Sequence, residues 1–147
     1  MRRGYVFVVT TTQESSGKIW LAHLIGMLFA LAFALFFAVL PVDVVSETGS
    51  KVGLYVLAAA LGPVTVLVLR FLADRLHLDR RRFVVIASAG AATFDGLFIG
   101  LWPDVYGHEG ADLANVAALI LFGLAAILIS DHIVAVNSLP RRKGNHS

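Results

Sequence analysis

Four long apolar stretches separated by short polar connections constrain this 147-residue chain more than any other feature. They cover about 19–40, 52–72, 83–102 and 113–136, and each is close to the roughly 20 residues that an α-helix needs to cross a bilayer. Only 15% of the residues are charged, whereas a soluble domain usually carries about a quarter. Because short connections force neighbouring helices to run in opposite directions, the sequence predicts an all-α, antiparallel four-helix bundle in a membrane.

Basic residues gather on one side of the predicted bundle, and eleven of the twelve lie before the first stretch, around the second connection or after the fourth stretch. They are Arg2, Arg3, Lys18, Arg70, Arg75, Arg80, Arg81, Arg82, Arg141, Arg142 and Lys143. Positively charged flanks of membrane spans stay in the cytoplasm. We therefore expect both termini and the 73–82 connection inside the cell (N-in, C-in), and the 41–51 and 103–112 connections outside.

The two ends of the chain differ from its apolar middle. Residues 1–18 are predicted to be a cytoplasmic N-terminal segment, in which residues 5–12, "YVFVVTTT", are too short to span a membrane. Residues 138–147 are predicted to be a basic cytoplasmic tail, which leaves 19–137 as one four-helix domain. Cysteine is absent, and this excludes disulfides, thiolate metal sites and cysteine nucleophiles.

One carboxylate lies inside the third apolar stretch, in "ATFDGLFIG". Asp95 is seven residues from Trp102, which places it about 10 Å from that end of a helix, too deep for an aspartate to reach the headgroups. Insertion of such a residue costs about 2.5–3.5 kcal/mol at a helix centre, so it usually faces the bundle interior or a water-filled cavity. Because no cation lies at its depth, we expect Asp95 to be protonated much of the time and to donate a hydrogen bond.

Tyr55 and Asn115 are the polar side chains expected at a depth similar to that of Asp95, in the outer halves of the second and fourth stretches. The sequence therefore predicts an outer polar site formed by Asp95, Asn115 and Tyr55. Two interpretations of this site remain open. One is a structural hydrogen bond between helices, and the other is a carboxyl group that binds a proton or a ligand.

Five small residues indicate where the third helix should meet its neighbours: Ser88, Ala91, Ala92, Gly96 and Gly100. The first three fall within about 60° of the aspartate on a helix with 100° per residue, so another helix can approach this face closely. The two glycines form a G-x-x-x-G pair on a second face, a spacing that often marks helix pairing. We therefore expect the third helix to pack through two faces.

A second polar group, formed by His23, Arg70, Asp131 and His132, is expected near the cytoplasmic ends of the helices. Interfacial solvation with an Arg70–Asp131 pair is one interpretation, because a long arginine can extend towards the headgroups. A cytoplasm-facing binding pocket or proton entry point is the alternative. The two histidines could also serve as axial ligands of a haem, but nothing else in the sequence supports haem binding. We find no phosphate-binding loop, nucleophile elbow or zinc motif, and so expect no cofactor, no metal and no catalytic residue.

The third and fourth stretches, with "FDGLFIGLWPDVYG" and "ALILFGLAAILISDHI", resemble a class of uncharacterised small bacterial four-span inner-membrane proteins. That class carries an aspartate in the third span and an aromatic–proline–aromatic outer turn, matched here by Asp95, Trp102, Pro103 and Tyr106. The resemblance covers about a third of the chain. It implies a bacterial inner-membrane location and brings no assigned activity.

Three classes of function follow from these observations. The first is a small integral membrane protein that works through helix–helix association, as an accessory or assembly subunit or as a homo-oligomer. The second is a proton-coupled small-molecule carrier that uses Asp95, as a dimer because four helices enclose little cavity. The third, a membrane-embedded enzyme, is least favoured because no catalytic pair is visible. The expected partners are membrane lipids and either a second copy or a larger membrane protein, with no nucleic acid.

Overall fold

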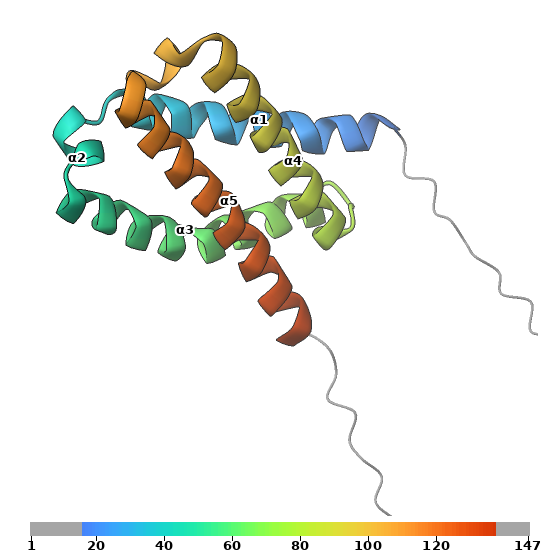
Figure 1. The fold of residues 1–147 in the computed structure, drawn as a ribbon. Coiled ribbons are helices and arrows are strands. Elements are labelled where there is room, and N and C mark those ends of the chain that lie inside the picture. Colours follow the sequence, from blue (N-terminus) through green and yellow to red (C-terminus); the bar gives the residue numbers. More distant parts are fainter. Residues whose placement is uncertain (1–15, 138–147) are drawn as a thin grey trace, which may run out of the picture.

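The computed structural model describes residues 16–137, and the regular elements in this part of the chain are helices. They are α1 (Ser16–Ala38), α2 (Val42–Ser46), α3 (Thr48–Arg75), α4 (Arg80–Leu101), the 3-10 helix η1 (Pro103–Tyr106) and α5 (Gly110–Asn137) (Figure 1). Within 16–137, α1, α3, α4 and α5 are long and apolar enough to cross a membrane, which confirms the predicted all-α architecture. The predicted tail 138–147 and nearly all of the predicted N-terminal segment 1–18 lie outside the described residues.

The long helices overlap the predicted apolar stretches closely, but their ends differ by a few residues, and α1 and α4 end at Ala38 and Leu101, short of the predicted 40 and 102. Helix α3, for example, covers 48–75, whereas the second apolar stretch covers 52–72. Polar and basic residues continue the helical backbone beyond the apolar part, and hydropathy alone does not detect them. The connections predicted at 41–51 and 103–112 are also partly helical, because α2 and η1 form within them.

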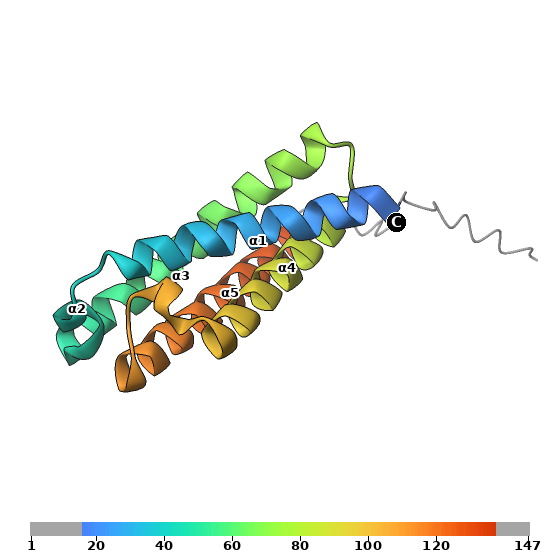
Figure 2. The same cartoon turned by 90° about the horizontal axis from the view of Figure 1, so that it is seen from above.

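The long helices form two crossing pairs, with α4 packed across α1 and α5 packed across α3 (Figure 1). Contacts of α4 with α3 and α5 join the two pairs. Within residues 16–137, α1 and α3 make no comparably extended contact with each other. Figure 2 shows that consecutive long helices run in opposite directions, as the short connections predict. The arrangement therefore leaves the space between α1 and α3 to be filled by side chains.

Basic residues mark one end of the bundle, which we call the basic end, and α2 and η1 lie at the other, which we call the connection end. At the basic end, α3 turns tightly into α4. His77 adopts a left-handed φ of 53°, and Asp79 caps α4 by accepting a hydrogen bond from the backbone N–H of Arg82 at 2.8 Å. Arg80 closes the turn with two hydrogen bonds to Asp74, of 2.6 and 2.9 Å.

Two glycines determine how closely α1 and α4 approach each other. A Cβ atom on Gly26 would lie 1.8 Å from the carbonyl oxygen of Ala87, and one on Gly90 would lie 2.1 Å from that of His23. Each glycine thus places its own backbone directly against the backbone of the facing helix. This contact differs from the predicted glycine pair, because Gly96 and Gly100 are exposed and have no atom within 4 Å of a built Cβ.

Candidate functional site

Asp95 is buried in α4, with 7% of its surface exposed, and its partner is a tyrosine from the connection that follows the helix. The hydroxyl of Tyr106 donates a hydrogen bond to Asp95 Oδ1 at 2.7 Å. Tyr106 itself is fully buried, although it belongs to η1 and lies outside the long helices. Burial raises the pKa of the Tyr106 phenol, and its hydrogen bond to Asp95 acts in the same direction. The phenol is therefore held as a donor towards the carboxylate.

The segment that carries Tyr106 is fastened to the end of α1. Gly107 has a φ of 68°, and a Cβ at this position would lie 2.8 Å from the carbonyl oxygen of Ala38. A glycine is favoured there both by the left-handed backbone and by the close approach to α1. The buried ring of His108 contacts the carbonyl oxygen of Phe37 through Nε2 at 3.0 Å. These contacts hold η1 over the connection end of the bundle and point its tyrosine inwards.

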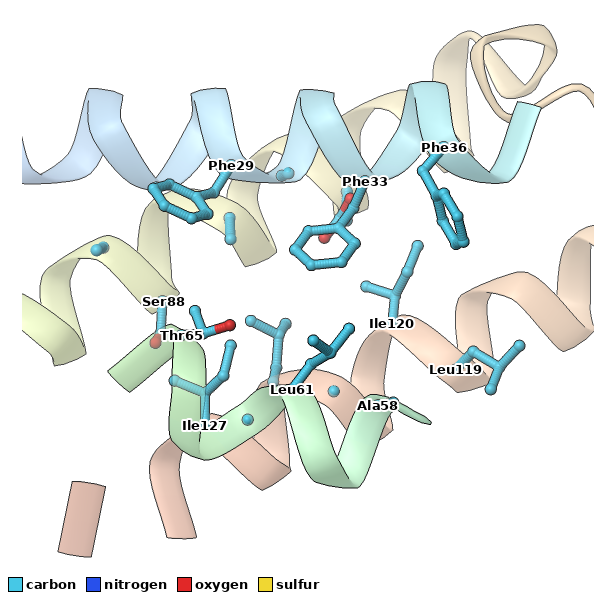
Figure 3. Close-up of a pocket in the computed structure, with 18 of the residues that line it drawn as sticks. Phe29, Phe33, Phe36, Ala58, Leu61, Thr65, Ser88, Leu119, Ile120 and Ile127 are labelled. Carbon is cyan, nitrogen blue, oxygen red and sulfur yellow. The ribbon is translucent and has the colours of Figure 1, made fainter. Parts of the chain in front are cut away.

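Asp95 lies on the wall of a cavity of about 110 Å³ between the four long helices. Phenylalanines of α1, among them Phe29, Phe33 and Phe36, project across it towards Leu61 and Thr65 of α3 (Figure 3). Side chains of α5, such as those of Ile120 and Ile127, complete the apolar wall. The cavity is thus largely apolar, and most of its polar atoms come from one face of α4 and from Thr65.

Ser88 provides the second polar group that α4 contributes to this cavity. It is 8% exposed, and its hydroxyl has no hydrogen-bond partner among residues 16–137. Ser88 and Asp95 are seven residues apart, which is two turns and about 10 Å along one helix face. Ala91 lies between them and also lines the cavity. Ser88, Ala91 and Asp95 therefore lie on one face of α4, and this face borders a cavity rather than a closely packed helix, whereas Ala92, expected on the same face, is exposed.

The cavity is partly open, and its mouth lies between α1 and α3. The cavity-lining side chains there are the more exposed ones: Phe33 and Phe36 of α1 are 37% and 42% exposed, and Leu57 and Leu61 of α3 are 44% and 36% exposed. By contrast, the lining residues of α4 include the buried Ala87, Ser88 and Asp95. The opening therefore faces sideways, between the helices, and α4 forms part of the floor.

The predicted outer polar site is not assembled in the form expected. Asn115 donates to the backbone carbonyl of Val45 at 3.1 Å, which joins α5 to α2. Tyr55 packs edge-on against Phe122, with ring centroids 5.0 Å apart. The prediction that either residue is the partner of Asp95 is thus wrong, because η1 folds back towards α4 and places Tyr106 at the carboxylate. Asp95 Oδ1 accepts a hydrogen bond from Tyr106, and the expectation that Asp95 is protonated and donates a hydrogen bond stays a prediction.

Of the predicted group at the basic end, the structure pairs two members. Arg70 binds Asp131 through an ion pair of 2.6 Å, and it also donates to the backbone oxygen of Asp131 at 3.0 Å. The side chains are 13% and 5% exposed, so this pair links α3 to α5 in a largely buried position. His23 packs edge-on against Trp20, and His132 is exposed. The four residues therefore do not form one pocket.

Three of the residues expected at helix contacts lie on the outside of α4. Ala92, Gly96 and Gly100 are exposed, and they do not form the contact with α1. That contact uses Gly26 and Gly90, which sequence reasoning missed because neither belongs to a G-x-x-x-G pair. It also missed Tyr106 as a functional residue, although the tyrosine was visible in the aromatic turn after α4.

Comparison of the chain with protein-family models, with curated proteins and with solved structures finds no match. The resemblance to small bacterial four-span proteins therefore stays a prediction from the quoted residues. The geometry of the cavity and the chemistry of the groups that line it are therefore the features that bear on function.

Proposed function

We propose that this protein is an integral membrane protein that admits a lipophilic molecule from the bilayer into the cavity between α1 and α3, as a binding protein or carrier. The observation that supports this most directly is the buried Asp95 on the wall of an otherwise apolar cavity with a sideways mouth. Ligand sites usually combine apolar walls with a few placed polar groups. An ionisable residue inside a span is a functional candidate by default.

The proposed location is the inner membrane of a bacterial cell, with all four long helices spanning it. The basic end would face the cytoplasm, since basic residues flank the ends of α1, α3 and α4 there. The connection end, with Asp43, Glu47, Asp104, Glu109 and Asp112, would face outwards. In this orientation the mouth between α1 and α3 opens directly to the hydrocarbon of the bilayer, so a lipophilic molecule would reach Asp95 without crossing water.

Gly123 offers a sharp test, because it lines the cavity and a Cβ there would meet no atom within 4 Å. Gly123→Leu should fill the cavity without disturbing the helices around it. Gly53→Leu is the matched control, since Gly53 is exposed, also has no atom within 4 Å of a Cβ, and does not line the cavity.

The readout is photolabelling of the protein in phosphatidylcholine nanodiscs that contain a lipid with a diazirine on its acyl chain. Peptide mapping should find label on the cavity-facing segments of α1 and α3 in the wild type and in Gly53→Leu. Gly123→Leu should lose most of it while keeping its helical circular dichroism. Equal labelling of all three proteins would show that the cavity does not admit apolar chains, and would overturn the proposal.

A second proposed function is helix–helix association, in which the protein acts as a homo-oligomer or as an accessory subunit. It is favoured by Gly96 and Gly100, which face outwards and leave a flat strip on α4 where another backbone could approach. Native mass spectrometry of gently extracted protein tests it. A dimer or a fixed larger assembly that is lost in Gly96→Leu and kept in Gly53→Leu supports association. A wild-type monomer, or an assembly that survives Gly96→Leu, contradicts it.

A further inference from the structure

The polar atoms of the cavity restrict what kind of head group a ligand can carry. Tyr106 occupies Oδ1 of Asp95, which leaves the second carboxylate oxygen for another donor. The ion pairs described within residues 16–137 are Arg70–Asp131 and Arg80–Asp74, and neither brings a cation to Asp95. The carboxylate thus has one neutral donor and an apolar surrounding.

The hydroxyl of Ser88 is the second restricting feature. A buried hydroxyl normally finds a partner, because leaving one unpaired costs about 1–3 kcal/mol. Ser88 is more than nine-tenths buried, lines the same cavity and has no partner. A serine in a helix can bond to the carbonyl one turn back, as the hydroxyl of Thr93 does to Ala89 at 2.8 Å, but Ser88 does not. Its hydroxyl is therefore available to a polar ligand atom.

The size of the cavity restricts the rest of the ligand. An apolar cavity of about 150 Å³ is known to accommodate benzene. The 110 Å³ found here would therefore enclose a small ring or a short run of methylenes. Any longer apolar part must leave through the mouth between Phe33 and Leu61. This favours a molecule with a small polar head inside the protein and an apolar tail that extends into the bilayer.

Resting on the proposed function, we propose that the ligand of this cavity is a single-chain lipophilic molecule whose head donates hydrogen bonds and is not anionic, namely an amine or an alcohol. The head donates to the free carboxylate oxygen of Asp95. Ser88 lies two turns along α4, about 10 Å away, so its hydroxyl can contact only a second polar atom further along the ligand. An anionic head is excluded because its charge would lie in an apolar cavity to which neither described ion pair brings a cation, and an ionised Asp95 would add like-charge repulsion. A pure hydrocarbon would leave the free carboxylate oxygen of Asp95 unsatisfied.

The test measures binding of radiolabelled dodecylamine to the protein in phosphatidylcholine nanodiscs, with empty nanodiscs subtracted. Unlabelled dodecanol, dodecanoic acid and dodecane serve as competitors, and this comparison needs no mutation. The amine should compete best and the alcohol next, whereas the acid and the hydrocarbon should be at least tenfold weaker. Whether the amine or the alcohol competes more strongly shows whether the preferred donor is an amine N–H or a hydroxyl O–H.

Three variants assign the contacts. Asp95→Asn keeps an oxygen for Tyr106 but removes the negative charge, and should weaken amine binding about tenfold or more, as expected for a hydrogen bond to a charged group. Ser88→Ala should leave dodecylamine binding unchanged, because a single head atom cannot reach both Asp95 and Ser88. Thr93→Val is the matched control, because Thr93 is a polar residue on the exposed side of α4 and does not line the cavity. Its binding should be unchanged.

The outcomes separate this inference from the proposed function. If dodecanoic acid or dodecane competes as well as the amine, the cavity admits lipophilic molecules but the head-group assignment is wrong. Equal amine binding by wild type and Asp95→Asn would overturn it in the same way. If none of the four compounds binds saturably to the wild type and the diazirine lipid labels no cavity segment, both proposals fail. If Asp95→Asn does not fold, the competitor series with the wild-type protein still decides.

Discussion

Gly26→Ala is the substitution for which the structure gives the most direct estimate. The added Cβ would lie 1.8 Å from the carbonyl oxygen of Ala87, whereas real Cβ contacts under 3.0 Å are essentially never found. The backbones of α1 and α4 would therefore have to move apart by about 1.2 Å. Forcing extra volume into a well-packed contact costs about 1–3 kcal/mol, and the cost is at the upper end here because the obstacle is backbone that cannot rotate away.

The same substitution at Gly53 isolates this cost. Replacing a helical glycine by alanine gains about 0.5–1 kcal/mol of conformational free energy at either position. Gly53 has no atom within 4 Å of a Cβ, so Gly53→Ala keeps this gain without a clash. The difference in unfolding free energy between the two variants should thus equal the clash alone, about 3 kcal/mol, with Gly26→Ala the less stable.

Unfolding in mixed micelles by titration with sodium dodecyl sulfate, followed by tryptophan fluorescence, measures this difference. Trp20 lies on α1 within two turns of Gly26 and should report the separation of α1 from α4. Gly90→Ala, which would meet the carbonyl oxygen of His23 at 2.1 Å, should behave like Gly26→Ala. If both variants were as stable as Gly53→Ala, the close approach of α1 and α4 would be refuted.

Two further predictions concern the buried polar pairs. Asp131→Asn should destabilise the protein by about 3 kcal/mol in the same titration, because it leaves the largely buried guanidinium of Arg70 without its anion. Adding Arg70→Met to this variant should restore most of the lost stability. A double variant no more stable than the single one would contradict this reasoning. Raising the pH above about 10 should destabilise the protein, because burial and then the hydrogen bond to Asp95 raise the pKa of the Tyr106 phenol above its ordinary value of 10.0 in the folded state. This contribution to the unfolding free energy is complete below the unfolded-state pKa of the phenol and is lost as the pH rises towards its folded-state pKa. Tyr106→Phe should therefore flatten the fall in stability at alkaline pH. An unchanged fall would contradict the role given to the Tyr106 phenol.

The features that were predictable from sequence are those that depend on composition or on depth within an apolar stretch. The long helices follow from hydropathy averaged over about 20 residues, which is insensitive to details of packing. The Arg70–Asp131 pair follows from two opposite charges at the same depth of neighbouring helices. Both features depend only on distance along a helix axis, and a sequence gives that distance directly through the rise per residue.

The partner of Asp95 was not predictable by this reasoning, because depth along a straight helix assigns every connection residue to the outside. Tyr106 reaches Asp95 because η1 folds back over the end of the bundle, and that path depends on the left-handed Gly107 against Ala38. The glycine contacts show a related difficulty. A G-x-x-x-G spacing marks a face that can pack closely, but it does not say which helix packs there, and in this chain α1 uses Gly90 instead of Gly96.

The same glycine contact explains why the bundle has a cavity at all. Because Gly26 and Gly90 let α1 lie directly on α4, α1 is drawn towards one side of the bundle, while α3 packs mainly on α5. The space left between α1 and α3 is bridged by phenylalanines, whose rings only partly close it (Figure 3). Small residues at Ser88 and Ala91 keep the floor open, and Asp95 at its edge is held in place by Tyr106.

A packing defect alone would require no buried carboxylate and no unpaired hydroxyl, each of which is costly in an apolar surrounding. Their presence together on one face of α4 is what favours a ligand site over an accident of packing.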